Sequence, residues 1–174
     1  MIRHLTPADY TAMPWANGRG TTVEMLRETG PDGSLLLRLS MASVAENGPF
    51  SIFPGIERNL TVISGPGFDL AGETRITAAP LIPIAFPGDA PIAALGVTGP
   101  CDDFNMMTAR ALPLPVVCVE TYAQIFPPKA GRLAIFSLNA GSVSGQTVGK
   151  HDLIITREKA RLVGGPFIIV TLTF

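Results

Sequence analysis

The chain has 174 residues, of which 47% are hydrophobic and 16% are charged, and its mean hydropathy is +0.34. This composition is typical of a globular domain with a sizeable core, because disordered chains are poorer in apolar residues and richer in charge. The formal net charge of −1 provides no broad basic field, so nucleic acid and membrane surfaces are not expected partners.

Short β-strands are the elements predicted along the chain. The 18 glycines and 16 prolines are spread over its whole length and separate runs rich in Val, Ile, Leu, Thr and Phe, as in an all-β domain with many turns. The segments "ADYTAM" and "REKARL" could each form a turn of helix. The expected strands are 20–27, 34–42, 59–64, 68–71, 82–86, 92–97, 103–108, 116–122, 132–138, 153–156 and 166–174.

The N-terminal segment "MIRHLTPADYTAM" lacks the apolar run of a signal peptide. No segment approaches the roughly 18 uninterrupted apolar residues of a membrane span. Cys101 and Cys118 are too few for a disulfide scaffold, although a single bridge between them stays open. We therefore expect a soluble, cytoplasmic protein.

One internal similarity bears on the architecture. The segment "LTVISGPGFDLAGET", residues 60–74, aligns without a gap to "LAIFSLNAGSVSGQT", residues 133–147, with matches at Leu, Val/Ile, Ser, Gly and Thr. This repeat favours two related β units, each a small barrel or jelly roll that buries the inward side of its strands.

The segment "WANGRGTTVEML", residues 15–26, contains the only tryptophan of the chain. It lacks the Gly-Lys-Ser/Thr and the following helix of a phosphate-binding loop, so Asn17-Gly18 is interpreted as a turn. Trp15 is either part of the core or the apolar wall of a pocket.

Two predicted strands carry polar residues on one face. In "LLLRLSMA", Arg38 and Ser40 alternate with leucines, so they point either to water or into a barrel lumen, where an arginine needs an anion. In "CDDFNMMTAR", Asp103, Asn105 and Met107 share one side. Because the glycine and glutamate of a calcium loop are missing, this side is interpreted as an inward polar face rather than a metal site.

The histidines limit the chemistry that the chain can perform. His4 and His151 are the only two, so a histidine-dependent triad or a metal centre with several histidines is hard to build, and no metal or other cofactor is expected. Paired carboxylates remain available for general acid–base catalysis, with Glu24, Asp89 and Asp103 as candidates.

Four segments in order, "MPWANGRGTTVEM", "RLSMASVAENGPFSIFPGIERNLTVISGPG", "FPGDAP" and "DFNMMTAR", closely resemble the signature blocks of the HutD/Ves family, the histidine-utilisation D proteins and their relatives. The match covers about residues 13–110, and the remainder fits only around "GRLAIFSL" and "HDLIIT". The resemblance implies an all-β double-stranded β-helix, or jelly-roll, bicupin. Its two cupin-like barrels would cover roughly residues 1–110 and 111–174, with strands possibly exchanged.

The resemblance also implies a set of ligand-binding residues. The family's motif positions, together with Met107 on the Asn105 face, are Trp15, Asn17, Gly18, Thr21, Glu24, Arg38, Ser40, Phe50, Ser51, Arg58, Asn105, Met107 and Arg110. The chain departs from the family pattern at Arg19, where a third glycine is usual, and at His151-Asp152, where a Gly-Asp pair is usual.

From these residues we expect a pocket for a small anionic metabolite. Arg38, Arg58 and Arg110 would supply positive charge, while Asn17, Ser40 and Asn105 would add neutral hydrogen bonds and Trp15 and Phe50 would exclude water. Glu24 would be the general base if the protein were an enzyme.

Two classes of function stay open. In the first, implied by the family, the protein restrains histidine catabolism by binding a small carboxylate such as N-formylglutamate without turnover. In the second, it is a metal-independent cupin enzyme, an isomerase or a lyase, that acts on a small organic acid. A homodimer is compatible with either class.

Overall fold

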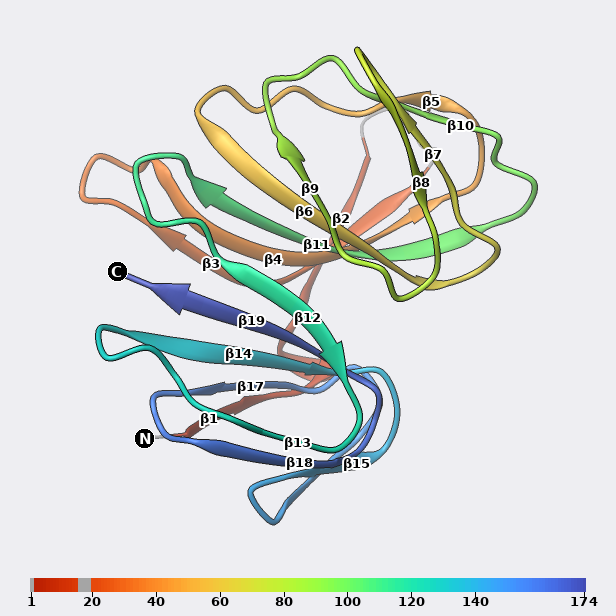
Figure 1. Cartoon of the computed structure of the whole chain (residues 1–174). Helices are drawn as coiled ribbons and strands as arrows, with labels where there is room; N and C mark the ends of the chain where they lie inside the picture. The colour runs from red at the N-terminus through yellow and green to blue at the C-terminus, as the bar shows by residue number, and fades with distance from the viewer. Residues whose placement is uncertain (1, 16–19) are drawn as a thin grey trace. The chain divides into compact units, whose positions relative to one another are not determined.

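The computed structural model describes residues 2–15 and 20–174, and it is an all-β fold (Figure 1). Apart from the 3-10 turn η1 (Pro7–Asp9), the regular secondary structure in these ranges is β-strand. The chain divides into two compact units. We call Thr11–Ala111 the central unit, and Met1–Tyr10 together with Leu112–Phe174 the terminal unit.

The central unit contains two antiparallel sheets. Inward residues of both sheets form one apolar cluster that includes Leu60, Val62, Phe68 and Phe86. One sheet has the order β2 (Thr11–Pro14), β3 (Thr21–Thr29), β4 (Leu35–Val44), β11 (Cys101–Ala109), β6 (Ile56–Ser64) and β9 (Ile84–Pro87). The other has the order β5 (Gly48–Pro49), β10 (Ala93–Leu95), β7 (Phe68–Ala71) and β8 (Arg75–Ala78).

The terminal unit also contains two antiparallel sheets around an apolar cluster, to which Leu133, Ile135, Phe167 and Ile169 contribute. One sheet has the order β1 (Ile2–Leu5), β17 (Leu153–Thr156), β14 (Gly131–Ser137), β19 (Phe167–Thr173) and β12 (Val116–Glu120). The other has the order β13 (Ala123–Ile125), β18 (Ala160–Gly164), β15 (Gly141–Val143) and β16 (Gln146–Val148).

The two units share one strand order. The series β4-β11-β6-β9 and β5-β10-β7-β8 of the central unit reappear as β12-β19-β14-β17 and β13-β18-β15-β16 in the terminal unit. The sequence repeat joins equivalent elements, since residues 60–74 cover the end of β6 and all of β7, and residues 133–147 cover the end of β14 and all of β15. Among the described strands, pairing does not close either unit into one continuous barrel.

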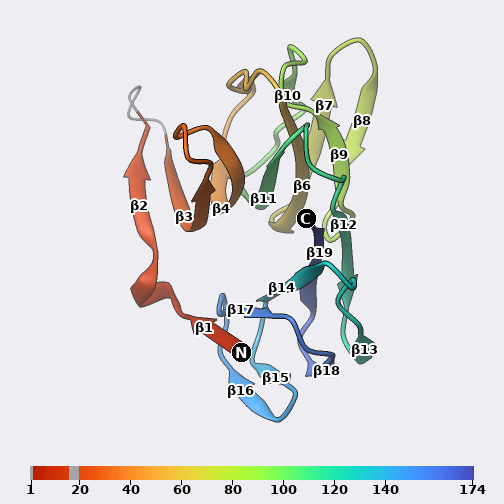
Figure 2. The ribbon, with the colours of Figure 1, turned by 90° about the vertical axis from the view of Figure 1, so that its left-hand side faces the viewer.

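The strand predictions agree with the structure for the longer elements, because each predicted range overlaps a strand. The segment "REKARL" is not helical: β18 begins at Ala160, and buried Ala160 and Leu162 alternate with exposed Arg161 in the period of a strand. In "ADYTAM", the turn η1 ends at Asp9 and strand β2 follows, paired with β3 (Figure 2).

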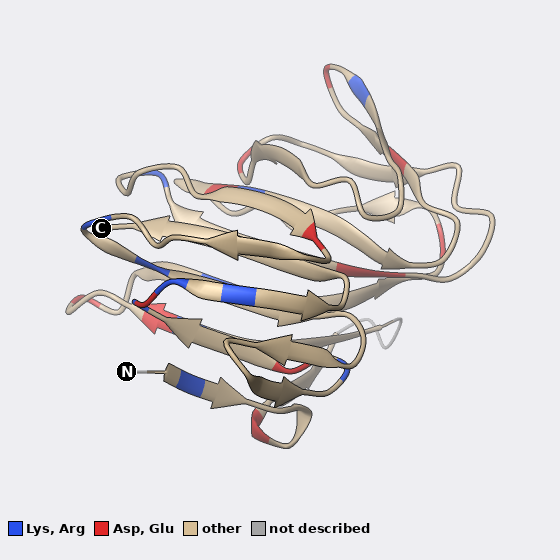
Figure 3. Cartoon of the chain, turned by 60° about the horizontal axis from the view of Figure 1, so that its bottom comes forward, with Lys and Arg blue, Asp and Glu red and all other residues tan. Residues whose placement is uncertain are grey.

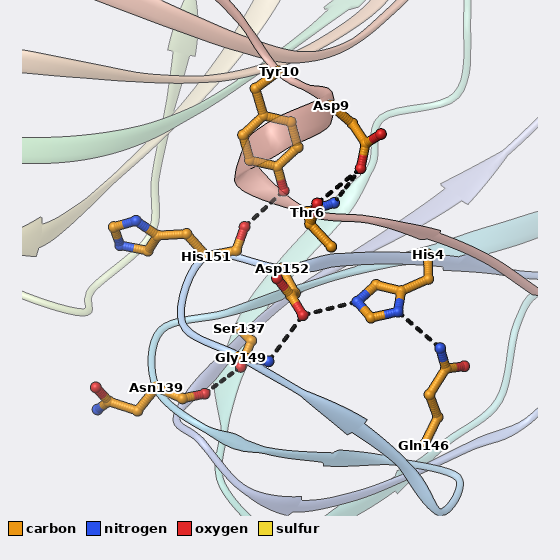
Figure 4. Close-up of polar contacts among 10 residues, drawn as sticks. All are labelled: His4, Thr6, Asp9, Tyr10, Ser137, Asn139, Gln146, Gly149, His151 and Asp152. Carbon is orange, nitrogen blue, oxygen red and sulfur yellow. Dashed lines mark hydrogen bonds and ion pairs between the residues drawn. The ribbon is translucent and has the colours of Figure 1, made fainter.

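The first ten residues belong to the terminal unit, and polar contacts hold them there (Figure 4). Strand β1 pairs with β17, and Asp152 Oδ2 lies 2.8 Å from both His4 Nε2 and the Gly149 amide nitrogen. Tyr10 donates its hydroxyl hydrogen to the His151 carbonyl oxygen at 2.6 Å. We call these contacts of His4, Tyr10 and Asp152 the N-terminal latch.

His151 has a φ of +68°, a left-handed conformation that glycine adopts most easily. This geometry accounts for the glycine that the family resemblance implies before Asp152. The ring of His151 stacks on Phe136, with 5.4 Å between ring centroids.

Charged residues are few and interspersed along the strands (Figure 3). Within residues 2–15 and 20–174, no helix has the length and apolar character needed to cross a membrane. Cys101 and Cys118 are both free thiols, so the bridge left open by the sequence is not formed.

Candidate functional site

A cavity of about 450 Å³ lies in the central unit, a size within the range of small-molecule sites. Its walls come from strands β3, β4, β5, β6 and β11, from the loop that follows β5, and from Trp15 just after β2. The lining residues are Trp15, Thr22, Arg38, Ser40, Ala42, Val44, Pro49, Phe50, Ser51, Phe53, Arg58, Asn105 and Met107.

Strand register brings the polar lining residues together. Met107 of β11 is paired with Arg38 of β4 and with Arg58 of β6, and Asn105 is paired with Ser40. Since alternate residues of a strand share a face, these five side chains form two adjacent rows on one face of the sheet. That face is the one that lines the cavity.

Arg58 is the most buried charge of the cavity wall, with 5% of its surface exposed. Its guanidinium carbon lies 5.3, 5.5 and 5.0 Å from the ring centroids of Phe50, Phe53 and Phe86. Nη2 donates to Asn105 Oδ1 at 3.1 Å, and Nη1 is 3.4 Å from the Ser51 carbonyl oxygen.

Within the described residues no carboxylate forms an ion pair with Arg58, and its Nε has no hydrogen-bond partner. Burial lowers the pKa of Arg58 to about 10, with a further lowering by Arg38 and an opposing effect of Asp103. The guanidinium therefore stays cationic at neutral pH and presents a positive charge with unused hydrogen-bonding capacity.

Arg38 differs from Arg58 because it has a carboxylate partner. Its Nε lies 2.8 Å from Glu24 Oε2, and the two side chains are 13% and 17% exposed. Glu24 lies on β3 opposite Ser40, beside the cavity rather than among its lining residues. The ion pair neutralises Arg38 and engages the carboxylate that the enzyme hypothesis requires as a general base.

Asp103 lies behind the lining residue Asn105 on the same face of β11, and it is fully buried. Asn105 donates a hydrogen bond from Nδ2 to Asp103 Oδ1. Among the described residues, Asp103 Oδ2 has no partner. Burial raises the pKa of Asp103 to about 7, although Arg58 and the hydrogen bond from Asn105 act in the opposite direction.

The structure places Trp15 in the cavity wall and so decides between the two interpretations left open by the sequence. Its indole Nε1 donates to Thr22 Oγ1 at 2.9 Å, and its amide donates to the Gly20 carbonyl oxygen at 2.8 Å. A Cβ at Gly20 would lie 2.8 Å from the indole ring, so glycine permits this close approach. Asn17, Gly18 and Arg19 lie outside the described residues.

The sequence predicted that Arg110 contributes positive charge to the pocket, but Arg110 does not line the cavity. It follows the end of β11, its side chain is 45% exposed, and it forms ion pairs with Glu57 and with Asp89, the latter at 2.7 Å. Thr21 also lies outside the lining, because the strand period of two directs Thr22, and not its exposed neighbour, toward the cavity.

Sequence reasoning missed Thr22, Ala42, Val44, Pro49 and Phe53. Continued alternation along the strand of Arg38 and Ser40 would have identified Ala42 and Val44. Phe53 lies in the loop between β5 and β6, where no periodic pattern assigns a direction to a side chain.

The two-sheet architecture defines an all-β protein of the cupin class. The bacterial pirin YhhW from Escherichia coli, solved with nickel(II), has this fold, with a TM-score of 0.67 over the full length of both chains and 7% identity.

Within this class the family is specific. The HutD family model matches residues 7–163, so the chain belongs to the HutD family. HutD from Pseudomonas fluorescens SBW25, whose structure was solved in a formate condition, has 31% sequence identity to this chain. Its structure matches with a TM-score of 0.89, over 99% of this chain and 98% of that one. A conserved Pseudomonas aeruginosa protein of unknown function is 26% identical with a TM-score of 0.83 over both full chains.

A curated relative from Pseudomonas putida, an uncharacterized 21.2 kDa protein in the hutC 3′ region, is 38% identical over 113 residues. This match covers 62% of the present chain and 58% of the length of the relative. The comparisons thus link the chain to proteins of a histidine-utilisation locus.

Proposed function

We propose that the protein binds a small carboxylate metabolite of histidine utilisation in the central cavity, without turnover, and thereby regulates that pathway. The observation that carries the proposal is Arg58, a buried cation without an ion-pair partner among the described residues. A buried charge is costly unless an opposite charge meets it, and a guanidinium binds a carboxylate through two parallel hydrogen bonds.

The remaining lining groups favour an anion that also has an apolar part and neutral polar atoms. Phe50, Phe53 and Trp15 offer apolar surface, while Ser40 and Asn105 offer hydroxyl and amide groups. N-Formylglutamate, with two carboxylates and a formamide, combines these features. Membership of the HutD family supports a ligand from histidine breakdown.

The proposed architecture is that of a bicupin, with each unit a jelly roll. Support comes from the common strand order of the two units and from the pairs of sheets around each apolar cluster. Jelly rolls are built from two such sheets with Greek-key connections.

The ligand proposal is tested by thermal unfolding in a panel of N-formylglutamate, urocanate, glutamate and formate, with sodium chloride at matched ionic strength. A ligand at a hundred times its Kd is expected to stabilise the fold by about 2.7 kcal/mol. We expect N-formylglutamate to give the largest rise in Tm. If no carboxylate raises Tm above the chloride control, the proposal is wrong.

Proton NMR of the same mixtures separates binding from catalysis. We expect the spectrum of each acid to keep its chemical identity during prolonged incubation. New product signals that depend on the protein would replace the proposed binding role with the alternative of an isomerase or lyase.

A further inference from the structure

We propose that Asp103 couples protons to anion binding in the central cavity, so that an anion at Arg58 and a proton on Asp103 each favour the other. This inference rests on the proposed function, because it requires an anion to bind at Arg58. It assigns a role to a residue outside the lining of the cavity.

Asn105 connects the two charged groups. Its amide oxygen accepts a hydrogen bond from Arg58 Nη2 at 3.1 Å, and its amide nitrogen donates to Asp103 Oδ1. These two contacts fix the orientation of the amide. Arg58 and Asp103 therefore lie at opposite ends of one side chain, close enough for each to respond to the charge of the other.

The same contacts identify the oxygen that takes the proton. Oδ1 accepts the hydrogen bond from Asn105 whether the carboxyl group is ionised or neutral, because a carboxylic acid keeps acceptor capacity. Oδ2 is buried and has no partner among the described residues. Protonation at Oδ2 removes the charge from Asp103 without breaking its hydrogen bond to Asn105.

The terminal unit shows that this position does not require an acid for folding. Asp103 is paired with Val62 of β6. The repeat aligns Val62 with Ile135, and Ile135 is paired with Ile169 of β19. Where the central unit has a fully buried aspartate, the terminal unit has an isoleucine, so the carboxyl group is a feature particular to the unit that contains the cavity.

The charges that act on Arg58 and Asp103, with Glu24 as the ion-pair partner of Arg38, favour such coupling. Arg58 on β6 and Arg38 on β4 provide two positive charges, while Glu24 on β3 and ionised Asp103 provide two negative charges. Asp102 is exposed and is bound by Ser43 and Ser64, and it adds a weaker repulsion. Val62, the β6 partner of Asp103, belongs to the apolar cluster to which the other sheet contributes Phe68, Leu70, Ala78 and Ala94.

This group of four charges is neutral while Asp103 is ionised. A carboxylate that enters beside Arg58 adds one negative charge to a region shielded from solvent, and a proton on Asp103 restores neutrality. Because burial raises the pKa of Asp103 to about 7, the proton uptake that accompanies anion binding is expected near neutral pH.

The direction of the pH effect follows from linkage. Below pH 7 Asp103 is largely neutral and the anion binds more tightly, whereas above pH 7 binding must be accompanied by proton uptake and the affinity falls. For one coupled proton the fall is at most about tenfold per pH unit. By reciprocity, bound anion raises the pKa of Asp103 further.

The experiment is a pH titration of ¹³C-labelled aspartate side chains by NMR in the full chain, with increasing sodium formate as probe and sodium chloride as control. The Asp103 carboxyl signal is assigned through its own Cβ, so the result does not depend on the folding of a variant. We expect a midpoint near pH 7 without formate and a higher midpoint with it. A midpoint near pH 4, or one that formate leaves unchanged, overturns the coupling.

The backbone amide NMR signals of the lining residues Ser40 and Met107 distinguish failure of the proton coupling from failure of the proposed anion site. If formate shifts these signals but not the Asp103 midpoint, the coupling is wrong and the anion site stands. If formate changes neither, both the coupling and the anion site are contradicted.

Two variants supply a matched pair for the pH profile of affinity. In Asp103→Asn we expect the affinity for formate to be nearly constant from pH 5.5 to 8.5. In Asp102→Asn, a change at the adjacent exposed carboxylate, we expect the pH dependence of the wild type to remain. A folded Asp103→Asn variant that keeps that dependence overturns the proposal.

Discussion

Arg58 and Arg38 occupy the same face of one sheet, yet their surroundings give them different roles. Three phenyl rings surround Arg58, and only neutral oxygen atoms accept its hydrogen bonds. Arg38 is paired with Glu24 at 2.8 Å. Cation–π contacts stabilise a guanidinium without neutralising it, so Arg58 remains able to bind an anion, whereas Arg38 is expected to contribute as a second donor whose charge Glu24 partly offsets.

The effect of the ion pair between Arg38 and Glu24 on ligand affinity can be tested by mutation. Arg38→Ala should weaken carboxylate binding by roughly 10- to 100-fold, since it removes a charged donor worth about 1.5–3 kcal/mol and leaves Glu24 with only the more distant Arg27 as an ion-pair partner. Arg38→Ala combined with Glu24→Gln should recover part of the loss, because the uncompensated negative charge is also removed. Isothermal titration calorimetry of both variants measures the difference.

An equal loss in the single and the double variant would show that Glu24 has no influence on the anion. Unchanged affinity in folded Arg38→Ala would remove Arg38 from the binding site. Arg27, which is more exposed and lies 3.7 Å from Glu24, offers a matched control as Arg27→Ala, for which we expect affinity close to that of the wild type.

Alternation in the sequence predicted which residues share a face of a strand, but not whether that face is exposed to solvent or lines a cavity. Arg38 and Ser40 between leucines fitted either a solvated surface or a lumen, and only the pairing of β4 with β11 places them beside Asn105 and Met107. Arg110 shows the limit of a family motif: it lies beyond the end of its strand, where no alternation applies, and its partners Asp89 and Glu57 are far away in the sequence.

At the scale of elements, apolar runs were predictable even where they are short, as in β7 and β17, whereas several short strands without such a run were missed. Strands such as β13, β15 and β16 have three residues each, too few to display a period. Their formation depends on pairing with neighbours that are distant in sequence, as between β13 and β18. The repeat nonetheless indicated two related units, because it compares two successive strands and their connection, one strand from each sheet of a unit.

The N-terminal latch is expected to hold strand β1 in place. Asp152→Ala removes the acceptor of His4 Nε2 and of the Gly149 amide, and the loss of these partly buried hydrogen bonds is expected to cost about 1 kcal/mol or more. We expect faster amide hydrogen exchange in residues 2–5 and a lower midpoint of denaturant unfolding. Hydrogen-exchange mass spectrometry measures the local effect.

Asp9→Ala is the control for the latch, because Asp9 is exposed and its carboxylate accepts hydrogen bonds from Thr6 at the start of the turn η1, not from a latch residue. It should leave exchange in β1 close to that of the wild type. If Asp152→Ala also leaves β1 fully protected, the latch does not hold the strand, and pairing with β17 suffices.

For the molecule as a whole, two units with a common strand order have different interiors. Positions that carry Arg58, Asp103 and Asn105 in the central unit align through the repeat and the strand register with Gly131, Ile169 and Thr171 in the terminal unit. The terminal unit thus has uncharged residues at these three positions, and only Ile169 among them is a buried apolar side chain. This contrast supports a division between a structural unit and a binding unit.

Calorimetric titration of N-formylglutamate into the wild type, Arg58→Met and Arg75→Met at neutral pH tests the central claim most directly. Methionine keeps apolar bulk among the phenyl rings but lacks the guanidinium, so Arg58→Met should stay folded and bind at least about tenfold more weakly. Arg75 is exposed and paired with Asp69, so its variant should bind like the wild type. Undiminished affinity in folded Arg58→Met would contradict an anion site at Arg58.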